Sequence, residues 1–468
     1  MSVGVQQPVA QPPLVAPARP RVAVVGGGLA GISAALRLAD DGARVTLLES
    51  RGRLGGAAFS FTRDGLLADN GQHVFLRCCT EYLRLVARIG AGALVTLQDR
   101  LSIPVLAPGG RSARLARGGL PAPLHLAGAL ARYPFLSPAG RLAAARAMRA
   151  LRAVDPDDPS ADRRSFGDWL AQHGQDARAV QALWELVARP TLNLAAGDAS
   201  LAQAAFVFQH GLLSDAGAAD VGYATVPLGE IHDVAARRAL ARAGVDVQLR
   251  RGVAAIVCDG EGFRIESGGA PSLDVDAVVL AVPHDRAARL LPACAGVDRA
   301  ALARLGSSPI VNLHVVYDRR VLEHPFAVGV DTPVQWLFDR TRPSGLCAGQ
   351  YLAVSLSGAE AELDMTVEEL RARFLPALAE LLPLARGARV ERFFVTRSHA
   401  ATFRAAPGSR SLRPGARTAL EGLVLAGAFT DTGWPATMEG AVRSGLAAAR
   451  EVRAALAARA SVGERVAA

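Results

Sequence analysis

Lysine is absent from this chain. All 52 basic residues are arginine, and with 43 acidic residues they leave a formal net charge of +9. Because alanine and glycine are also abundant, the absence of lysine is typical of a GC-rich coding bias. The positive charge is therefore weak evidence for nucleic acid, and no zinc-finger, RRM or KH pattern accompanies it. We expect no nucleic-acid partner.

Cysteine is scarce and poorly arranged for a scaffold. The five cysteines are Cys78, Cys79, Cys258, Cys294 and Cys347. Five is an odd number, two of them are adjacent, and no C-x-x-C occurs. The pattern predicts neither a disulfide framework nor a zinc site, and it fits a reducing cytoplasm.

Long hydrophobic runs are missing too, although half of the chain is hydrophobic. No run of 18 uncharged apolar residues occurs, so we expect no membrane-spanning helix. Residues 1–20 contain five prolines and lack the apolar core of a signal peptide, which predicts a disordered arm. With 468 residues, the chain is long enough for two domains with substantial cores.

What is present begins with a glycine motif between two predicted strands, residues 21–25 and 45–49. Gly26, Gly28 and Gly31 follow the first strand at G-x-G-x-x-G spacing and open an apolar helix. This order predicts a dinucleotide site with the pyrophosphate at the helix N-terminus. Glu49 ends the second strand, where its carboxylate can accept hydrogen bonds from a ribose diol. A bare structural turn is the alternative.

A second glycine pair follows Glu49 closely. The segment Glu49-Ser50-Arg51-Gly52-Arg53-Leu54-Gly55-Gly56 resembles the E-x-R-x-R-x-G-G segment of the FAD-dependent amine oxidase and phytoene desaturase superfamily. The resemblance implies a Rossmann-type FAD domain in which the pair and its arginine lie along the pyrophosphate. It favours FAD over NAD. Ala57 departs from the pattern, since arginine often follows the pair.

The block Asp69-Asn70-Gly71-Gln72-His73 narrows the resemblance. It follows a predicted hairpin with its turn at Asp64-Gly65 and precedes an amphipathic helix over residues 81–89. This block is similar to the corresponding block of the hydroxysqualene dehydroxylase family. In the superfamily to which that family belongs, the loop formed by this block passes near the flavin ring. His73 is a candidate catalytic acid, and a structural hydrogen bonder is the equally weighted alternative.

The third block lies near the C-terminus. Residues 423–426 predict a strand, Pro435 is expected in a first helical turn, and Glu439 to Gly445 resembles the superfamily's E-G-A-x-x-S-G flavin motif. Ala428 stands where the family usually has Asp. Asp431, in the loop between strand and helix, is the second candidate acid.

The resemblance gives the complete FAD assignment. In the superfamily the backbone near Val253 contacts adenine. The residues assigned to FAD are Gly26, Gly28, Leu29, Ala30, Gly31, Glu49, Ser50, Arg51, Arg53, Gly55, Gly56, Val253, Gly427, Ala428, Pro435 and Met438, and no metal ligand is assigned.

Residues 101–154 have an unusual charge pattern. They hold eight arginines and no Asp or Glu, interleaved with apolar residues. A basic amphipathic segment of this kind can lie on an anionic membrane, with its arginines at the phosphates. An ordinary helical lid with solvated arginines is the alternative.

The expected fold is α/β, a Rossmann-type FAD domain with an interleaved α+β substrate domain. The FAD domain is assigned to residues 21–100, 222–300 and 415–458, the substrate or membrane-facing domain to 101–221 and 301–414, and a flexible tail to 459–468. Residues 165–210 are expected to be helical with a break at Pro190.

The resemblance implies that reduced FAD removes the hydroxyl of hydroxysqualene to give squalene, in the cytoplasm at the inner face of the cell membrane. The sequence does not identify the electron donor. A carotenoid-type desaturase and an FAD-binding protein without turnover are the alternatives. An amine oxidase fits less well, because only five tyrosines and four tryptophans are available for an aromatic amine cage.

Overall fold

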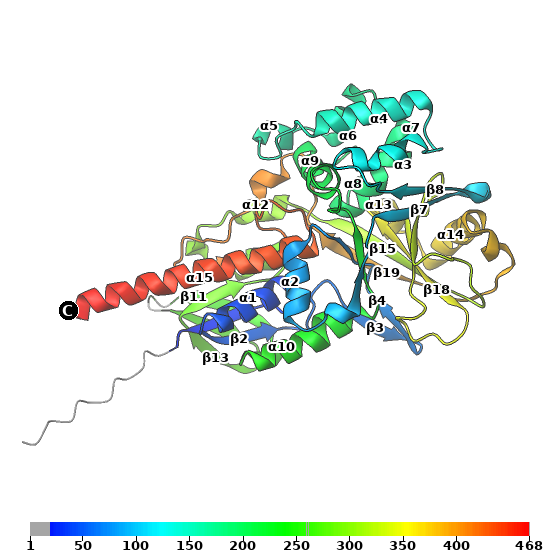
Figure 1. The fold of residues 1–468 in the computed structure, drawn as a ribbon. Coiled ribbons are helices and arrows are strands. Elements are labelled where there is room, and N and C mark those ends of the chain that lie inside the picture. Colours follow the sequence, from blue (N-terminus) through cyan, green and yellow to red (C-terminus); the bar gives the residue numbers. More distant parts are fainter. Residues whose placement is uncertain (1–18, 259, 261, 468) are drawn as a thin grey trace, which may run out of the picture.

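The computed structural model describes residues 19–258, 260 and 262–467. Nearly all of the arm expected over residues 1–20 lies outside this range. The rest of the chain forms two large sheets and a helical layer (Figure 1).

The first sheet is parallel and has five strands in the order β10-β2-β1-β14-β20. Its strands come from distant parts of the sequence: β1 (Arg21–Val25), β2 (Arg44–Glu49), β10 (Asp246–Leu249), β14 (Ala277–Leu280) and β20 (Leu423–Leu425). The central strands are almost fully buried, which explains their continuous Val, Leu and Ala runs. The parallel strand order is that of a Rossmann-type sheet, and the burial of its central strands shows that both faces of the sheet are covered.

Two helices from opposite ends of the chain pack together beside this sheet. Helix α1 (Leu29–Asp40) and helix α15 (Met438–Ala467) run side by side (Figure 1). A Cβ atom on Gly445 would lie only 2.1 Å from the carbonyl oxygen of Ala30, so this close approach requires glycine. The Ser33 hydroxyl adds a 3.2 Å hydrogen bond to the carbonyl of Val442. The first and last motifs are thereby fixed to each other.

A small antiparallel sheet extends this part of the molecule. It consists of β11 (Val253–Cys258), β12 (Phe263–Ser267) and β13 (Ala270–Val275). Helix α10 (Ala236–Arg242) leads from the middle of the chain into β10.

The second large sheet has seven strands in the order β19-β15-β18-β17-β16-β7-β8. The strands are β7 (Ser102–Ala107), β8 (Arg111–Ala116), β15 (Ser308–Tyr317), β16 (Phe326–Gly329), β17 (Trp336–Asp339), β18 (Gln350–Ser357) and β19 (Val390–Thr402). Helix α14 (Val367–Leu381) packs on it through Leu370, Phe374 and Leu378. The strands of the parallel sheet lie within the ranges assigned to the FAD domain, and those of the seven-stranded sheet lie within the ranges assigned to the substrate domain. The domain boundaries themselves stay a prediction.

A helical layer covers the top of the view in Figure 1. It includes α4 (Pro138–Leu151), α6 (Phe166–Gln172), α8 (Glu185–Leu192) and α9 (Leu201–Phe208). Phe166, Trp184 and Phe208 form its aromatic centre.

The expected helix break at Pro190 is wrong, because Pro190 lies inside α8. Proline has no N–H to donate to the carbonyl of Leu186 one turn earlier. The indole Nε1 of Trp336 donates to that carbonyl instead, at 3.3 Å. The helix ends two residues later at Leu192, and the next residue, Asn193, has left-handed backbone angles. A contact from the large sheet therefore keeps the proline in the helix.

Helix α15 continues to Ala467, so most of the expected tail has helical backbone, and its flexibility stays a prediction. Alanine and arginine favour the helix. The Arg459 guanidinium contributes a further restraint, because it donates to the carbonyls of Asp276, at 2.9 Å, and Glu421, at 2.5 Å.

Within the described residues, no helix is long and apolar enough to cross a membrane.

Candidate functional site

The glycines of the first motif are required by two very close backbone contacts. A Cβ on Gly26 would lie 2.2 Å from the carbonyl oxygen of Ala281, and one on Gly31 would lie 1.9 Å from that of Gly26. Gly28 differs, because a Cβ there would meet nothing nearer than the Cα of Gly56 at 3.8 Å. The protein therefore leaves space beside the backbone of Gly28, as a site where a ligand lies directly against that backbone requires.

The second glycine pair lies directly against the first motif. The Gly55 N–H donates to the carbonyl of Gly27 at 2.9 Å. A Cβ on Gly56 would lie 2.8 Å from the Cα of Gly28. Helix α1 begins after Gly28 without a side-chain cap, so the N–H groups of its first turn, at Leu29 and Ala30, stay available to an anion. The two glycine segments therefore form one cradle at the positive end of a helix.

Glu49 lies beside this cradle at the carboxyl end of β2. Its buried carboxylate accepts hydrogen bonds from the N–H groups of Gly27, at 2.7 Å, and Arg51, at 2.8 Å. The Ser50 hydroxyl donates to the same carboxylate at 3.2 Å.

The chain returns to this point just before β11. The Arg251 N–H donates to the Glu49 carbonyl at 2.8 Å, and a Cβ on Gly252 would lie 3.6 Å from the Cβ of Ser50. Val253 is thus next to the ribose end of the cradle, with its carbonyl accepting from Arg286 at 3.1 Å. Its contact with adenine stays a prediction.

Arg53 covers the outer side of the second glycine pair. Its guanidinium donates to the carbonyls of Leu54 and Gly56, at 3.2 and 3.1 Å, and lies 3.4 Å from the centroid of the Phe59 ring. Burial, together with the neighbouring charge of Arg51, lowers the pKa of Arg53 to about 10. The side chain stays cationic at neutral pH, and its contact with the pyrophosphate stays a prediction.

The C-terminal loop is held by Arg413, a buried arginine that the sequence analysis missed. Its guanidinium donates to four loop carbonyls: those of Ala428, Phe429, Thr430 and Trp434. Burial lowers the pKa of Arg413 to about 10. Gly427 has a φ of 141°, and its N–H donates to the Ser444 hydroxyl at 2.8 Å. Because Arg413 orders the loop, the alanine at 428 leaves the loop's shape intact.

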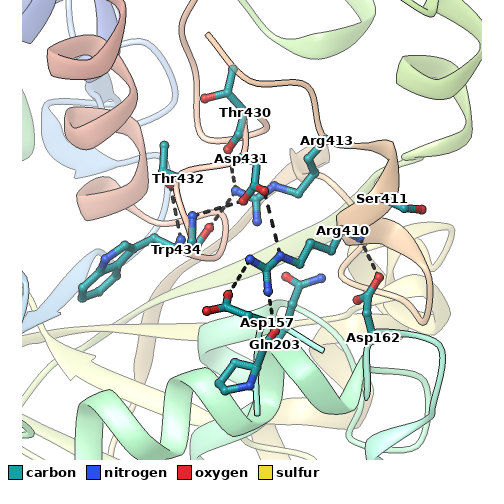
Figure 2. A network of polar contacts seen from close by, with 12 residues as sticks. Asp157, Asp162, Gln203, Arg410, Ser411, Arg413, Thr430, Asp431, Thr432 and Trp434 are labelled. Carbon is teal, nitrogen blue, oxygen red and sulfur yellow. Dashed lines mark hydrogen bonds and ion pairs between the residues drawn. The ribbon is translucent and has the colours of Figure 1, made fainter. Parts of the chain in front are cut away.

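Figure 2 shows that Asp431 belongs to the same polar network. Its carboxylate lies 3.9 Å from the Nε of Arg410, which also pairs with Asp157 at 2.6 Å. The Arg410 N–H donates to the buried Asp162 at 3.1 Å. The Asp431 carboxylate is therefore held within the polar network around Arg410.

Helix α15 begins at Met438, so Pro435 lies outside its first turn, contrary to expectation. The Thr437 hydroxyl caps the helix instead, accepting from the Gly440 N–H at 3.1 Å. The buried Glu439 carboxylate accepts from the N–H groups of Glu81 and Tyr82, at 3.1 and 2.7 Å. It therefore caps helix α2 (Thr80–Arg88) and joins the C-terminal motif to the segment after His73.

Asn70 fixes the D-N-G-Q-H loop to the cradle. Its side chain donates to the Ala57 carbonyl and accepts from the Phe59 N–H, both at 2.8 Å. Its own carbonyl accepts from Asn312 of β15, at 3.1 Å, and Thr396 of β19, at 3.2 Å. The loop thus lies between the FAD-type cradle and the large sheet.

A small cavity of about 20 Å³ opens where this loop meets the large sheet, enough for one water molecule. Arg340, at the end of β17, pairs with the buried Asp69 at 2.7 Å on its wall. The residues lining it are Asp69, Gln72, His73, Val74, Tyr223, Ala224, Leu228, Pro325, Phe338, Asp339 and Arg340, so the lining includes His73 but not Asp431. Arg340 follows an ordinary strand pattern and carries no sequence signal of this role.

His73 has a defined protonation pattern in this wall. Its Nδ1 lies 3.1 Å from the carbonyl oxygen of Gly71, which can only accept, so Nδ1 carries the proton. In the neutral ring, Nε2 is then an acceptor. Burial lowers the pKa of His73, with a smaller opposite effect from the Gly71 hydrogen bond and Asp69. The ring is neutral near pH 7.

Two further histidines are buried close to the site and were not singled out from the sequence. His232 bonds through Nε2 to the Tyr82 hydroxyl at 2.9 Å, and His314 bonds to Tyr351 at 2.6 Å and Thr396 at 3.0 Å. Burial lowers the pKa of each to about 3. Both are held neutral by their surroundings, and both serve the packing of the site.

The Rossmann-type sheet, the double glycine cradle and the closing C-terminal helix define a flavin-dependent oxidoreductase of the two-domain type. Residues 29–453 match the model of the flavin containing amine oxidoreductase family. The chain belongs to this family, and its cofactor is FAD. The cradle fits this group, because room is left above Gly28 and the helix N-terminus carries no cap.

Similar proteins include several isoprenoid enzymes. The chain is 31% identical to hydroxysqualene dehydroxylase of Rhodopseudomonas palustris, over 93% of this chain and 98% of that protein. It is 26% identical to a zeta-carotene desaturase of Arabidopsis thaliana, over 91% of this chain and 84% of that protein. A solved structure of a putrescine oxidase double mutant shares the fold, with a TM-score of 0.70 and 19% identity over 93% and 99% of the two chains.

Proposed function

We propose that this protein is an FAD-dependent enzyme that removes the hydroxyl of the allylic alcohol hydroxysqualene to give squalene. The observation that carries the proposal is the 31% identity to a hydroxysqualene dehydroxylase over nearly the full length of both proteins. The cavity wall contributed by the D-N-G-Q-H loop supports it, since Gln72 and His73 put polar groups beside the apolar side chains of Val74, Leu228 and Phe338.

The residues of the cradle would hold FAD by its pyrophosphate at the N-terminus of α1 and by its ribose at Glu49. In its reduced form FAD supplies a hydride, which together with one proton replaces the carbon–oxygen bond of the alcohol by a carbon–hydrogen bond and releases water.

The remaining chemistry falls to the chain. Val74, Leu228 and Phe338 form the apolar part of the cavity wall and would keep bulk water from the hydroxyl as it leaves. His73 is proposed as the acid, because a histidine with a lowered pKa donates its proton readily once it is protonated. Asp431 becomes a weaker candidate, since it faces Arg410 and is not part of the cavity wall.

We also propose that the enzyme acts at an anionic membrane surface on the cytoplasmic side, where its isoprenoid substrate would reside. Three large apolar side chains of the acid-free segment are exposed: Leu120 at 56%, Leu124 at 57% and Leu142 at 53%. On helix α4, Leu142, Arg146 and Arg149 lie on the exposed face, opposite the buried Ala144, Ala147 and Leu151. The helix lies at the outer edge of the molecule in Figure 1.

The test is anaerobic incubation of the FAD-loaded protein, reduced photochemically, with hydroxysqualene. Squalene should form in an amount equal to the flavin oxidised, followed by mass spectrometry and by the return of the flavin absorption. Protein in which FAD has not been reduced is the control and should form none. Flavin oxidation without squalene would contradict the proposal.

The relatedness to zeta-carotene desaturases supports one second candidate, a desaturase that removes hydride from a polyene. Oxidised enzyme should then be bleached by a carotene precursor and not by squalene. A protein that holds FAD but reacts with neither class would be a binding protein without turnover.

A further inference from the structure

The small cavity beside the D-N-G-Q-H loop has an unsatisfied hydrogen-bond donor in its wall. Gln72 lines the cavity, and its side-chain Nε2 is buried without a hydrogen-bond partner among the described residues. A buried donor without an acceptor costs on the order of 1–3 kcal/mol. Such a group is tolerated where a ligand or an ordered water supplies the missing acceptor.

The same wall offers an acceptor. Because Nδ1 of His73 is bonded to the Gly71 carbonyl at 3.1 Å, Nε2 of the neutral ring keeps its lone pair. The Arg340 guanidinium is directed at Asp69 and at the carbonyls of Ala224 and Val226. Gln72 and His73, which are neighbours in the chain, therefore offer the cavity one donor and one acceptor.

Size and chemistry together select the occupant. The cavity of about 20 Å³ holds one oxygen-sized group and excludes an isoprenoid branch. An N–H donor together with a nitrogen lone pair matches a hydroxyl, which accepts one hydrogen bond and donates another. A methyl group of a hydrocarbon would leave both unpaired.

We propose that Gln72 and His73 form the subsite that binds the hydroxyl of the substrate, with Gln72 donating to the oxygen and neutral His73 accepting from it. The inference rests on the proposed function and adds the group that selects an alcohol over a hydrocarbon. It also puts His73 at the leaving oxygen, the one position from which its protonated form can release water.

Binding to the oxidised holoenzyme tests the subsite without turnover. Hydroxysqualene and squalene are titrated separately in detergent micelles, and the change in flavin absorption gives each dissociation constant. Wild type should prefer the alcohol by about tenfold or more, the worth of one well-placed hydrogen bond. In Gln72→Met, which keeps the shape and loses the donor, the preference should fall several-fold, because only the hydrogen bond to His73 remains.

Two variants complete the experiment. Gln72→Glu keeps a polar side chain of the same length but removes the N–H donor, so it should lower the preference as well. Gln172→Met, at an exposed position of α6, is the matched control and should keep it.

Three results would overturn the inference. If FAD-loaded Gln72→Met keeps the preference for hydroxysqualene over squalene, even with a lower melting temperature, the donor of Gln72 does not bind the substrate. The cavity would then hold a structural water molecule. Loss of FAD binding in both Gln72 variants would assign Gln72 to the loop's architecture. Equal affinities of the wild-type protein for hydroxysqualene and squalene would show directly that no subsite recognises the hydroxyl. Failure of the proposed function shows separately, as absence of squalene formation by wild type.

Discussion

Arg340 and Asp69 form a buried ion pair, with Nη2 of the arginine 2.7 Å from Oδ2 of the carboxylate. Asp69 ends β4 (Leu66–Asp69) and Arg340 follows β17 of the large sheet, so the pair joins the two halves of the molecule beside the cavity. The Asp69 carboxylate also accepts from the Ser60 hydroxyl at 2.6 Å and the Leu228 N–H at 3.0 Å. Folding therefore replaces the water around both charges by these protein partners.

Removal of one partner should be strongly destabilising. Arg340→Met leaves Asp69 charged and buried, and we expect the free energy of unfolding to fall by about 3–5 kcal/mol. Thermal unfolding of the FAD-loaded protein measures it. Arg389→Met, which breaks the exposed pair with Glu391, is the control and should change stability by less than about 1 kcal/mol. Equal losses of unfolding free energy in the two variants would show that the buried pair contributes no more to stability than the exposed pair.

Gly28→Val should abolish FAD binding and leave the protein folded. A Cβ at position 28 meets no protein atom closer than the Cα of Gly56, at 3.8 Å, so the valine side chain is expected to fill the space that the pyrophosphate needs. Purified protein should be colourless, as judged by its absorption spectrum and by FAD release on denaturation. Gly119→Val, in open surroundings, should stay yellow. A yellow Gly28→Val protein would contradict the assignment of this cradle.

The role of His73 as an acid predicts a pH dependence with a defined sign. Burial places its pKa below the ordinary value of 6.5, so the protonated form is scarce above that pH and declines about tenfold per pH unit. The single-turnover rate of flavin oxidation by hydroxysqualene should therefore fall as pH rises from about 6.5 to 8.

Substitution separates this role from a structural one. His73→Gln should lower the rate by roughly 10²-fold or more and flatten the pH profile, with FAD content unchanged. His399→Gln, at an exposed position, should behave as wild type. If His73→Gln reacts at the wild-type rate, the ring serves only to bond the Gly71 carbonyl.

Membrane docking predicts binding to anionic vesicles that weakens with salt. The arginines at 146 and 149 are exposed and form no ion pair within the described residues. Their attraction to lipid phosphates is screened over about 10 Å at 0.1 M salt. Co-sedimentation with phosphatidylglycerol vesicles should fall from low to high salt, and Arg146→Glu with Arg149→Glu should weaken it further.

Apolar contacts and general charge are controlled separately. Leu142→Ser should weaken binding at every salt concentration, because its effect is not electrostatic. Arg371→Glu with Arg386→Glu, a reversal of the same size outside the acid-free segment, should have little effect. Binding that ignores salt, or equal losses in the two double variants, would leave residues 101–154 as an ordinary lid.

Local sequence was enough for the parts of the site that are continuous in the chain. The strand, the three glycines and Glu49 lie within about one βαβ unit, where turn geometry and helix polarity depend on neighbouring residues. The hairpin turn at Asp64-Gly65 is also local, and both residues have the positive φ that such a turn needs, 50° and 78°. For these elements, residue type and spacing determine the backbone.

Tertiary contacts decided the rest. Pro190 has no N–H to donate to the Leu186 carbonyl, and the indole N–H of Trp336, far away in the sequence, donates to that carbonyl instead. Glu439 caps α2 instead of its own helix, and Arg413 holds the C-terminal loop by donating to its carbonyls. The cavity with Gln72, His73 and Arg340 exists only where the D-N-G-Q-H loop meets the large sheet. Long-range partners of this kind carry no periodic signal, since the free energy that selects them comes from burial in the folded chain.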